Sequence, residues 1–213
     1  MNQRRGAQLP SEVWHRPLRT VRPQDLAGVY AQPRPEIARL VEQGALHRVA
    51  HGYYVVVPPE YVGRNWLPGL EAAAAGIASS IYGADRAVVM GISAARLLGA
   101  IPRALATAVL AVPGQHRPIV LADRPAQVRF VRRDTDVLDA ERVETPLGAT
   151  LVTTPEQTVL DLAHRPGLGN AETEVRSAIA TLYLRSDPVR LAELAADQRL
   201  GAALRRVRSA VEA

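Results

Sequence analysis

The sequence predicts a mixed α/β protein in which a small unit of helices and one β-hairpin precedes a larger α/β unit. Three observations predict this class. Residues 33–57 join a helical pattern to a hairpin pattern. Residues 88–153 hold short β-branched segments that Pro and Gly residues separate. Residues 171–211 show helical periodicity, so we expect the chain to end in helices.

Two short helices are expected before residue 30. Ser11 suits the cap of a helix over residues 12–14, because its hydroxyl can accept a hydrogen bond from a free backbone N–H. Pro23 suits the first turn of a second helix over residues 20–27, where a missing N–H costs nothing.

A third helix and a hairpin are predicted over residues 33–57. Pro33 and Pro35 suit the start of the helix, and Gly44 suits its end. Between them one apolar stripe has helical spacing: Ile37, Leu40 and Val41. Apolar, β-branched and aromatic residues then surround a turn near His51-Gly52. Three helices followed by a hairpin are the order of a winged helix-turn-helix, which binds DNA.

The chain divides after the hairpin. Pro58-Pro59 ends it, and residues 63–68 have the composition of a linker. We therefore predict a winged-helix domain over residues 1–62 and a C-terminal domain over residues 69–213. Expected helices in the second domain cover residues 70–82, 94–98, 156–164, 171–184, 188–196 and 200–211, with Ser93 and Thr154 as caps. Expected strands cover residues 88–90, 107–112, 119–121, 128–132 and 150–153.

Composition excludes several classes of protein. The chain has 213 residues and no cysteine, and all 26 of its Lys and Arg residues are arginine. A disulfide framework, a cysteine–zinc site, a P-loop lysine and a Schiff-base lysine are therefore excluded. The apolar runs are too short for a membrane span, and no signal-peptide pattern follows the first residues. We expect a cytoplasmic protein without a membrane partner.

Catalytic and metal-binding residues are not indicated. Five histidines without cysteine or a His-x-His spacing make a poor metal site. Asp161 stands four residues before Arg165, which predicts an ion pair on a helix. An acidic run predicts an exposed loop: Asp134, Asp136, Asp139, Glu141 and Glu144. Since no nucleophile lies beside a base, we expect a regulator rather than an enzyme, with no cofactor.

Net positive charge is concentrated in the segment that contains the hairpin. Residues 1–57 have a net charge of +4 from eight Arg and four acidic residues, and the remainder has +1. Positive charge there favours contact with DNA phosphates. The third helix is expected to face the major groove with Arg34, Glu36, Arg39 and Gln43. Backbone or minor-groove contacts are expected from Arg48 and His51, and further phosphate contacts from Arg4, Arg5, Arg19 and Arg22.

Three segments resemble the family of AbiEi antitoxins, in the order that the family has them. The segment from Gly44 to Tyr54 is similar to its G-x-L-x-R-V-x-x-G-x-Y pattern, at the end of the winged helix. Ser93 to Gly99 is similar to its S-x-A-x-x-L-x-G element. Val152 to Ala163 is similar to its V-T-x-P-x-R-T-L-x-D-L-A segment. Two positions depart from the family, because Ala50-His51 stands at a tip that is often Arg-rich and Gln157 replaces an arginine.

The resemblance implies the antitoxin of a type IV, abortive-infection toxin–antitoxin pair. Such a protein represses its own operon by binding promoter inverted repeats as pairs or dimers, and neutralises a nucleotidyltransferase-like toxin. Two alternatives stay open. One is an enzymatic antitoxin that modifies the toxin or reverses its product. The other is a protein-binding antitoxin that does not bind DNA.

Overall fold

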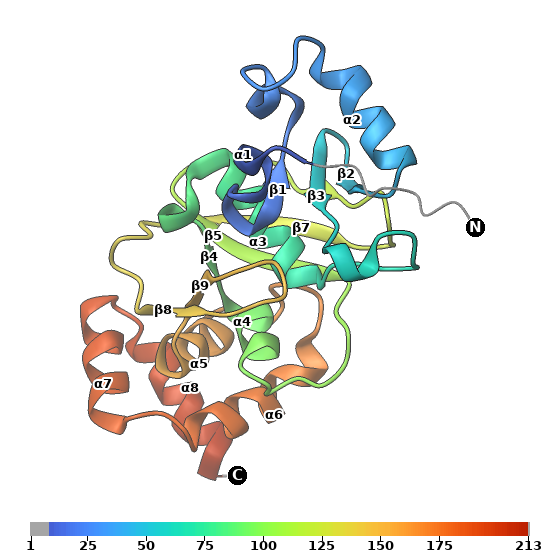
Figure 1. The fold of residues 1–213 in the computed structure, drawn as a ribbon. Helices are drawn as coiled ribbons and strands as arrows, with labels where there is room; N and C mark the ends of the chain where they lie inside the picture. Colours follow the sequence, from blue (N-terminus) through green and yellow to red (C-terminus); the bar gives the residue numbers. More distant parts are fainter. Residues whose placement is uncertain (1–8, 213) are drawn as a thin grey trace.

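The computed structural model describes residues 9–212 and has the mixed α/β fold that the sequence predicts, with two β-sheets (Figure 1). Arg4 and Arg5, which the sequence predicts to contact phosphates, lie outside the described residues. None of the helices within residues 9–212 combines the length and the apolar character that a membrane crossing requires.

The N-terminal elements follow the predicted order of helices and then a hairpin. They are α1 (Ser11–Trp14), η1 (Pro17–Arg19), β1 (Thr20–Val21), η2 (Pro23–Leu26), α2 (Pro33–Glu42), β2 (Leu46–Ala50) and β3 (Tyr53–Val56). The helix expected over residues 20–27 is instead a two-residue strand and a 3₁₀ turn. The three strands form an antiparallel sheet in the order β1-β3-β2.

Local sequence accounts for the course of α2 and the hairpin. Gly44 and Gly52 have φ values of +72° and +80°, a conformation that favours glycine, and they lie where the helix ends and the hairpin turns. Ile37 and Leu40 point from α2 into a small apolar cluster with Leu26 and Val56. The outward side of α2 is therefore left to polar residues.

A longer α/β segment follows the hairpin. Its first part contains η3 (Pro59–Tyr61), α3 (Leu70–Tyr82), η4 (Ala84–Arg86), β4 (Val88–Val89), α4 (Gly91–Leu97), β5 (Thr107–Val112), β6 (Ile119–Val120), β7 (Gln127–Arg132), β8 (Ala140–Val143) and β9 (Thr150–Thr153). Its last part is helical: α5 (Pro155–His164), α6 (Glu172–Tyr183), α7 (Pro188–Asp197) and α8 (Gly201–Glu212).

The second sheet has the strand order β6-β7-β5-β4-β9-β8. Its β5–β7 and β4–β9 pairs are parallel, and its other pairs are antiparallel. Helices α4 to α8 lie on one side of this sheet, and α3 lies on the other, beside the N-terminal elements (Figure 1). The sheet thus stands between the hairpin and the C-terminal helices.

Helix α3 is packed on all sides. Its residues from Leu70 to Ser79 are all buried, and the helix contacts β5 on one side and η1 and β1 on the other. Six of these residues are Ala or Gly, and small side chains let backbones approach closely. At Gly76 the neighbour is Thr20 of β1, so this glycine lets α3 pack closely against the N-terminal sheet.

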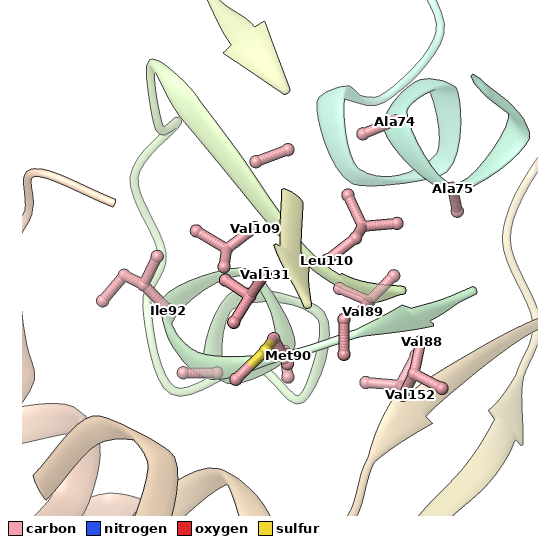
Figure 2. Packing of buried hydrophobic residues seen from close by; sticks show 14 of the residues in the cluster. Ala74, Ala75, Val88, Val89, Met90, Ile92, Val109, Leu110, Val131 and Val152 are labelled. Atoms are coloured by element: carbon pink, nitrogen blue, oxygen red, sulfur yellow. The ribbon is translucent and has the colours of Figure 1, made fainter. Parts of the chain in front are cut away.

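The core lies around the central strands. Figure 2 shows Val88 and Val89 of β4, Val109 and Leu110 of β5 and Val152 of β9 among buried side chains from the flanking helices. Every residue of β5 is buried, as expected for a strand that helices cover on both faces.

Two local interpretations of the sequence need correction. Ser93 does not cap α4, because the helix begins at Gly91 and the Ser93 hydroxyl accepts a hydrogen bond of 2.8 Å from the Val109 N–H of β5. The acidic run is not loop throughout, since Ala140–Val143 forms the edge strand β8. The cap predicted at Thr154 is confirmed, with its hydroxyl accepting from the Gln157 N–H.

Candidate nucleic-acid interface

A hollow of about 570 Å³ lies between η2, α2 and the β2–β3 hairpin, and we call it the hairpin groove. Four sequence-predicted residues line it: Arg22, Arg34, Arg48 and His51. These residues are up to 29 positions apart in the chain, and the fold of the N-terminal sheet brings them together. The groove is therefore rich in groups that can bind anions.

Arg34 enters the groove from the first turn of α2. Ile37, one turn later on the same side, is buried and fixes the direction of this helix edge. Arg34 itself is exposed, and no carboxylate within residues 9–212 forms an ion pair with it. Its guanidinium is available for a ligand.

Arg48 and His51 enter the groove from the hairpin. Both are exposed, and an N–H of Arg48 donates to Nδ1 of His51 across 3.2 Å. The pairing of β2 with β3 shifts register between Arg48 and Ala50, which leaves an irregularity just before the tip. Such bulges re-aim side chains, and here Arg48 and His51 lie together.

Arg22 differs from these residues because its charge is already neutralised by an ion pair with Asp25. The two side chains form a bidentate pair, with distances of 3.1 Å from Nε to Oδ2 and 3.0 Å from Nη2 to Oδ1. Asp25 also accepts from the Arg22 backbone N–H at 2.9 Å. Arg22 thus contributes little net charge to the groove, whose uncompensated cations within the described chain are Arg34 and Arg48.

The remaining predicted residues of α2 form a separate network. Arg39 donates to Glu36 in a bidentate pair and to Oε1 of Gln43 across 3.0 Å. The hydrogen bonding from Arg39 to the Glu36 carboxylate lowers the pKa of Glu36. Arg34 and Arg39 are five residues apart, so they project about 140° apart around the helix. The structure therefore splits the predicted α2 set between the groove edge and the outward face.

Arg19 lies apart from the groove. Its guanidinium carbon lies 5.6 Å from the centre of the Trp14 ring, a cation–π geometry. Arg19 therefore lies beside Trp14 of α1, and it does not line the hairpin groove.

Sequence reasoning missed three polar groove residues, Gln24, Tyr53 and Tyr54. Burial raises the pKa of Tyr53, which is half-buried in the groove wall. The two tyrosines follow the turn glycine of the hairpin, so their position beside the tip could have indicated them. Gln24 had no such signal, because only the packing of η2 against the hairpin brings it there.

The back of the hairpin is joined to the larger sheet. Nε2 of His47 lies 2.8 Å from Oδ2 of Asp123, and the Ala122 N–H donates to the Val49 carbonyl across 2.8 Å. A bridge also pairs Ala50 with Leu121, just after β6. Burial acts to raise the pKa of Asp123, but hydrogen bonds from His47 and Arg124 outweigh it, and the net pKa is lowered.

Comparison with known proteins identifies a family and a similar fold. Residues 87–212 match a family model described as the AbiEi antitoxin C-terminal domain. The crystal structure of the RV2827C protein from Mycobacterium tuberculosis is similar, with a TM-score of 0.61 and 18% sequence identity. That likeness covers 96% of this chain and 78% of the other, and it concerns the fold. No curated protein gives a significant match.

Proposed function

Because the chain belongs to the family of the AbiEi antitoxin C-terminal domain, we propose that it is an antitoxin that also represses its own operon. The match over residues 87–212 carries the antitoxin part of the proposal. The partner toxin would be nucleotidyltransferase-like, and the pair would act in the cytoplasm. Residues 1–62 would be the DNA-binding domain, and residues 69–213 the antitoxin domain.

The hairpin groove supports the DNA-binding part. In a winged helix the third helix enters the major groove, and the hairpin lies against the flanking backbone. The outward face of α2 offers Arg39, Gln43 and Glu36, which can bond base edges once their mutual contacts open. Arg34 and Arg48 would then grip the phosphate strand that passes between α2 and the hairpin, beside His51.

The operator would carry inverted repeats. One copy of the chain presents one hairpin groove within the described residues, so two half-sites require two copies on the DNA. Arg4, Arg5 and Arg19 would add phosphate contacts at the edge of each half-site, and Arg22 would do so once its pair with Asp25 opens.

A gel-shift series with the upstream region of the gene tests the operator contacts. Arg39→Ala should weaken specific binding by about 1–3 kcal/mol and relax sequence preference, because it removes a base contact. Arg34→Ala and Arg48→Ala should weaken binding to any sequence and reduce the slope of log affinity against log salt by about 1 each.

Arg176→Ala is the matched control, because Arg176 is an exposed arginine of α6, and α6 lies on the other side of the large sheet from α2 and the β2–β3 hairpin (Figure 1). It should bind like the unmodified protein. Loss of operator binding in Arg176→Ala to the same degree, or no loss in Arg34→Ala and Arg48→Ala, would remove the hairpin groove from the interface.

Antitoxin activity is tested separately, by co-expression with the toxin encoded beside it. The chain should restore growth, and a variant defective in operator binding should still do so when expressed from a foreign promoter. Co-purification with the toxin and no operator shift would favour the protein-binding alternative. Modification of the toxin by the purified chain would favour the enzymatic alternative.

A further inference from the structure

A segment of the larger α/β part lies along the tip of the β2–β3 hairpin. We call residues 113–120 the flanking segment, which consists of the loop after β5 and the edge strand β6. Leu121, the next residue, forms an antiparallel bridge with Ala50 at the end of β2. Because the bridge is antiparallel, the residues that precede Leu121 run in the direction of the turn that follows Ala50. The flanking segment therefore passes beside the tip that borders the hairpin groove.

Aromatic contacts fix the loop of the flanking segment in place. The centre of the His116 ring lies 4.6 Å from that of Phe130 in β7 and 6.4 Å from that of Tyr82. The Tyr82 hydroxyl donates to the Gly114 carbonyl across 3.3 Å, and a Cβ at Gly114 would lie 3.2 Å from the Tyr82 ring. Tyr82 is the last residue of α3, the helix that packs against η1 and β1. The loop is thus held on the side of the large sheet that faces the N-terminal elements.

Tyr53 connects this loop to the hairpin groove. It lines the groove, and like Tyr82 it packs against the large apolar core. Burial is the largest cause of the raised pKa of Tyr53, Arg22 opposes the rise, and the neighbouring Tyr82 adds to it. The contacts therefore lead from Tyr53 in the groove to Tyr82, and from Tyr82 to Gly114 and His116.

Arg117 gives the flanking segment an uncompensated positive charge. It is exposed, and no carboxylate within residues 9–212 forms an ion pair with it. Residues 113–122 contain no acidic residue. Val120 of β6 is 71% exposed, so the segment offers a cation and an apolar side chain at its surface. This chemistry suits a sugar–phosphate backbone, which presents both anionic and apolar groups.

We propose that the flanking segment binds the backbone of the same DNA duplex that occupies the hairpin groove, with Arg117 on a phosphate and Val120 against a sugar. The inference rests on the proposed function, because it takes operator DNA as the occupant of the groove. A strand that leaves the groove past His51 meets the flanking segment next, since the segment lies beside the tip. The DNA interface then crosses the predicted linker at residues 63–68, and the larger domain positions the duplex without reading its sequence.

Fluorescence anisotropy with the operator duplex and with a scrambled duplex, at several salt concentrations, measures the contribution of Arg117. Arg117→Ala should weaken binding to both duplexes by about three- to tenfold and reduce the slope of log affinity against log salt by about 1. Arg129→Ala is the matched control. Arg129 is also exposed and free of ion pairs in the described chain, and it precedes Phe130, so strand alternation places it on the opposite face of β7.

Cleavage of the DNA by a tethered reagent reports the position of the segment directly. The chain has no cysteine, so one introduced cysteine can carry an iron–EDTA group that cuts nearby DNA backbone. Gln115 is exposed in the flanking segment, and Gln115→Cys should cut the operator duplex at the flank of each half-site. Arg129→Cys, on the opposite face of the sheet, should not cut it.

The outcomes separate this inference from the proposed function. If Arg34→Ala and Arg48→Ala weaken binding but Arg117→Ala does not, or if Gln115→Cys leaves the duplex intact, the flanking segment is not part of the interface and the groove still is. Equal loss in Arg117→Ala and Arg129→Ala would also overturn the inference, because it would mean that only the overall charge matters. Failure of the unmodified protein to bind the operator would overturn both.

Discussion

At the scale of single residues, Gly76 shows how tightly α3 is held against the N-terminal sheet. A Cβ at this position would lie 2.0 Å from Oγ1 of Thr20 and 3.0 Å from its Cβ. Thr20 is buried, and its hydroxyl donates to the Leu18 carbonyl across 3.1 Å. The threonine cannot turn away without losing that bond, so the glycine is required by packing rather than by backbone conformation.

We predict that Gly76→Ala destabilises the protein by about 1–3 kcal/mol, because the overpacking outweighs the gain of about 1 kcal/mol that alanine brings to a helix. Gly28→Ala is the control, since a Cβ there meets nothing within 4 Å and should change stability by less than about 0.5 kcal/mol. Urea unfolding of the three proteins measures this. A more stable Gly76→Ala would show that the contact with Thr20 is not tight.

The sequence could not predict which polar side chains pair when they are far apart in the chain. The spacing of Asp161 and Arg165 predicted an ion pair on one helix. In the structure Asp161 pairs with Arg133, which is 28 residues earlier and directly follows β7. Local spacing reports only on neighbours along a helix, whereas the partner here depends on how α5 packs against the sheet. The positions of Arg34 and Arg48 were predictable, because local helix and hairpin signals place Arg34 at the start of α2 and Arg48 in β2, and their contact with DNA stays a prediction.

At the scale of elements, regular helices and buried strands were predictable and short edge strands were not. The helix over 70–82 and the strands over 107–112 and 150–153 have the bounds expected from the sequence. Strands β1 and β8 were missed, since β1 has two residues and β8 contains Glu141 and Arg142. Edge strands are often charged, so they lack the apolar signal that identifies central strands.

Helix α3 also carries a buried acid, Glu71, with a side chain that is 2% exposed. Arg96 Nη1 lies 3.4 Å from its Oε2, and Oε1 receives no hydrogen bond from the described residues. Burial raises the pKa of Glu71 above its ordinary value of 4.5, although its own backbone N–H and the charges of Arg96 and Arg124 oppose this. The folded protein therefore holds this proton more tightly than the unfolded chain does.

The sign of the resulting pH dependence follows from that difference. The contribution of Glu71 to stability is fully present below the unfolded pKa and is lost as pH rises through the folded pKa. Glu71→Gln removes this loss and keeps an acceptor for Arg96. We predict that the variant gains stability relative to the unmodified protein as pH rises from about 4 to 7.

Urea unfolding at several pH values measures that gain. Glu42→Gln, which changes an exposed acid at the end of α2, is the control and should show no comparable trend. A stability difference for Glu71→Gln that is flat or falls with rising pH would mean that Arg96 compensates the buried charge fully.

At the scale of the whole molecule, the hairpin and the large sheet share one apolar core. Val49 and Val55 of the hairpin belong to the same buried cluster as Val109 and Leu110 of β5. The sequence predicted two domains but gave no signal for their contact, because it depends on the packing of α3 and on the loop that carries Asp123. Leu26 and Leu40, in contrast, belong to a separate small cluster under α2.

We therefore predict that the N-terminal elements and the large sheet unfold together. The chain has two tryptophans, Trp14 and Trp66, and both precede α3. Their fluorescence reports on the N-terminal part, whereas far-UV circular dichroism reports mainly on the helices α3 to α8. In urea the two signals should change at one midpoint, because a shared core makes unfolding cooperative. Asp123→Ala removes the contact with His47, so it should lower the free energy of unfolding by about 1–3 kcal/mol and move that midpoint to a lower urea concentration. Fluorescence that changes well before circular dichroism in the unmodified protein would mean that the two parts fold independently.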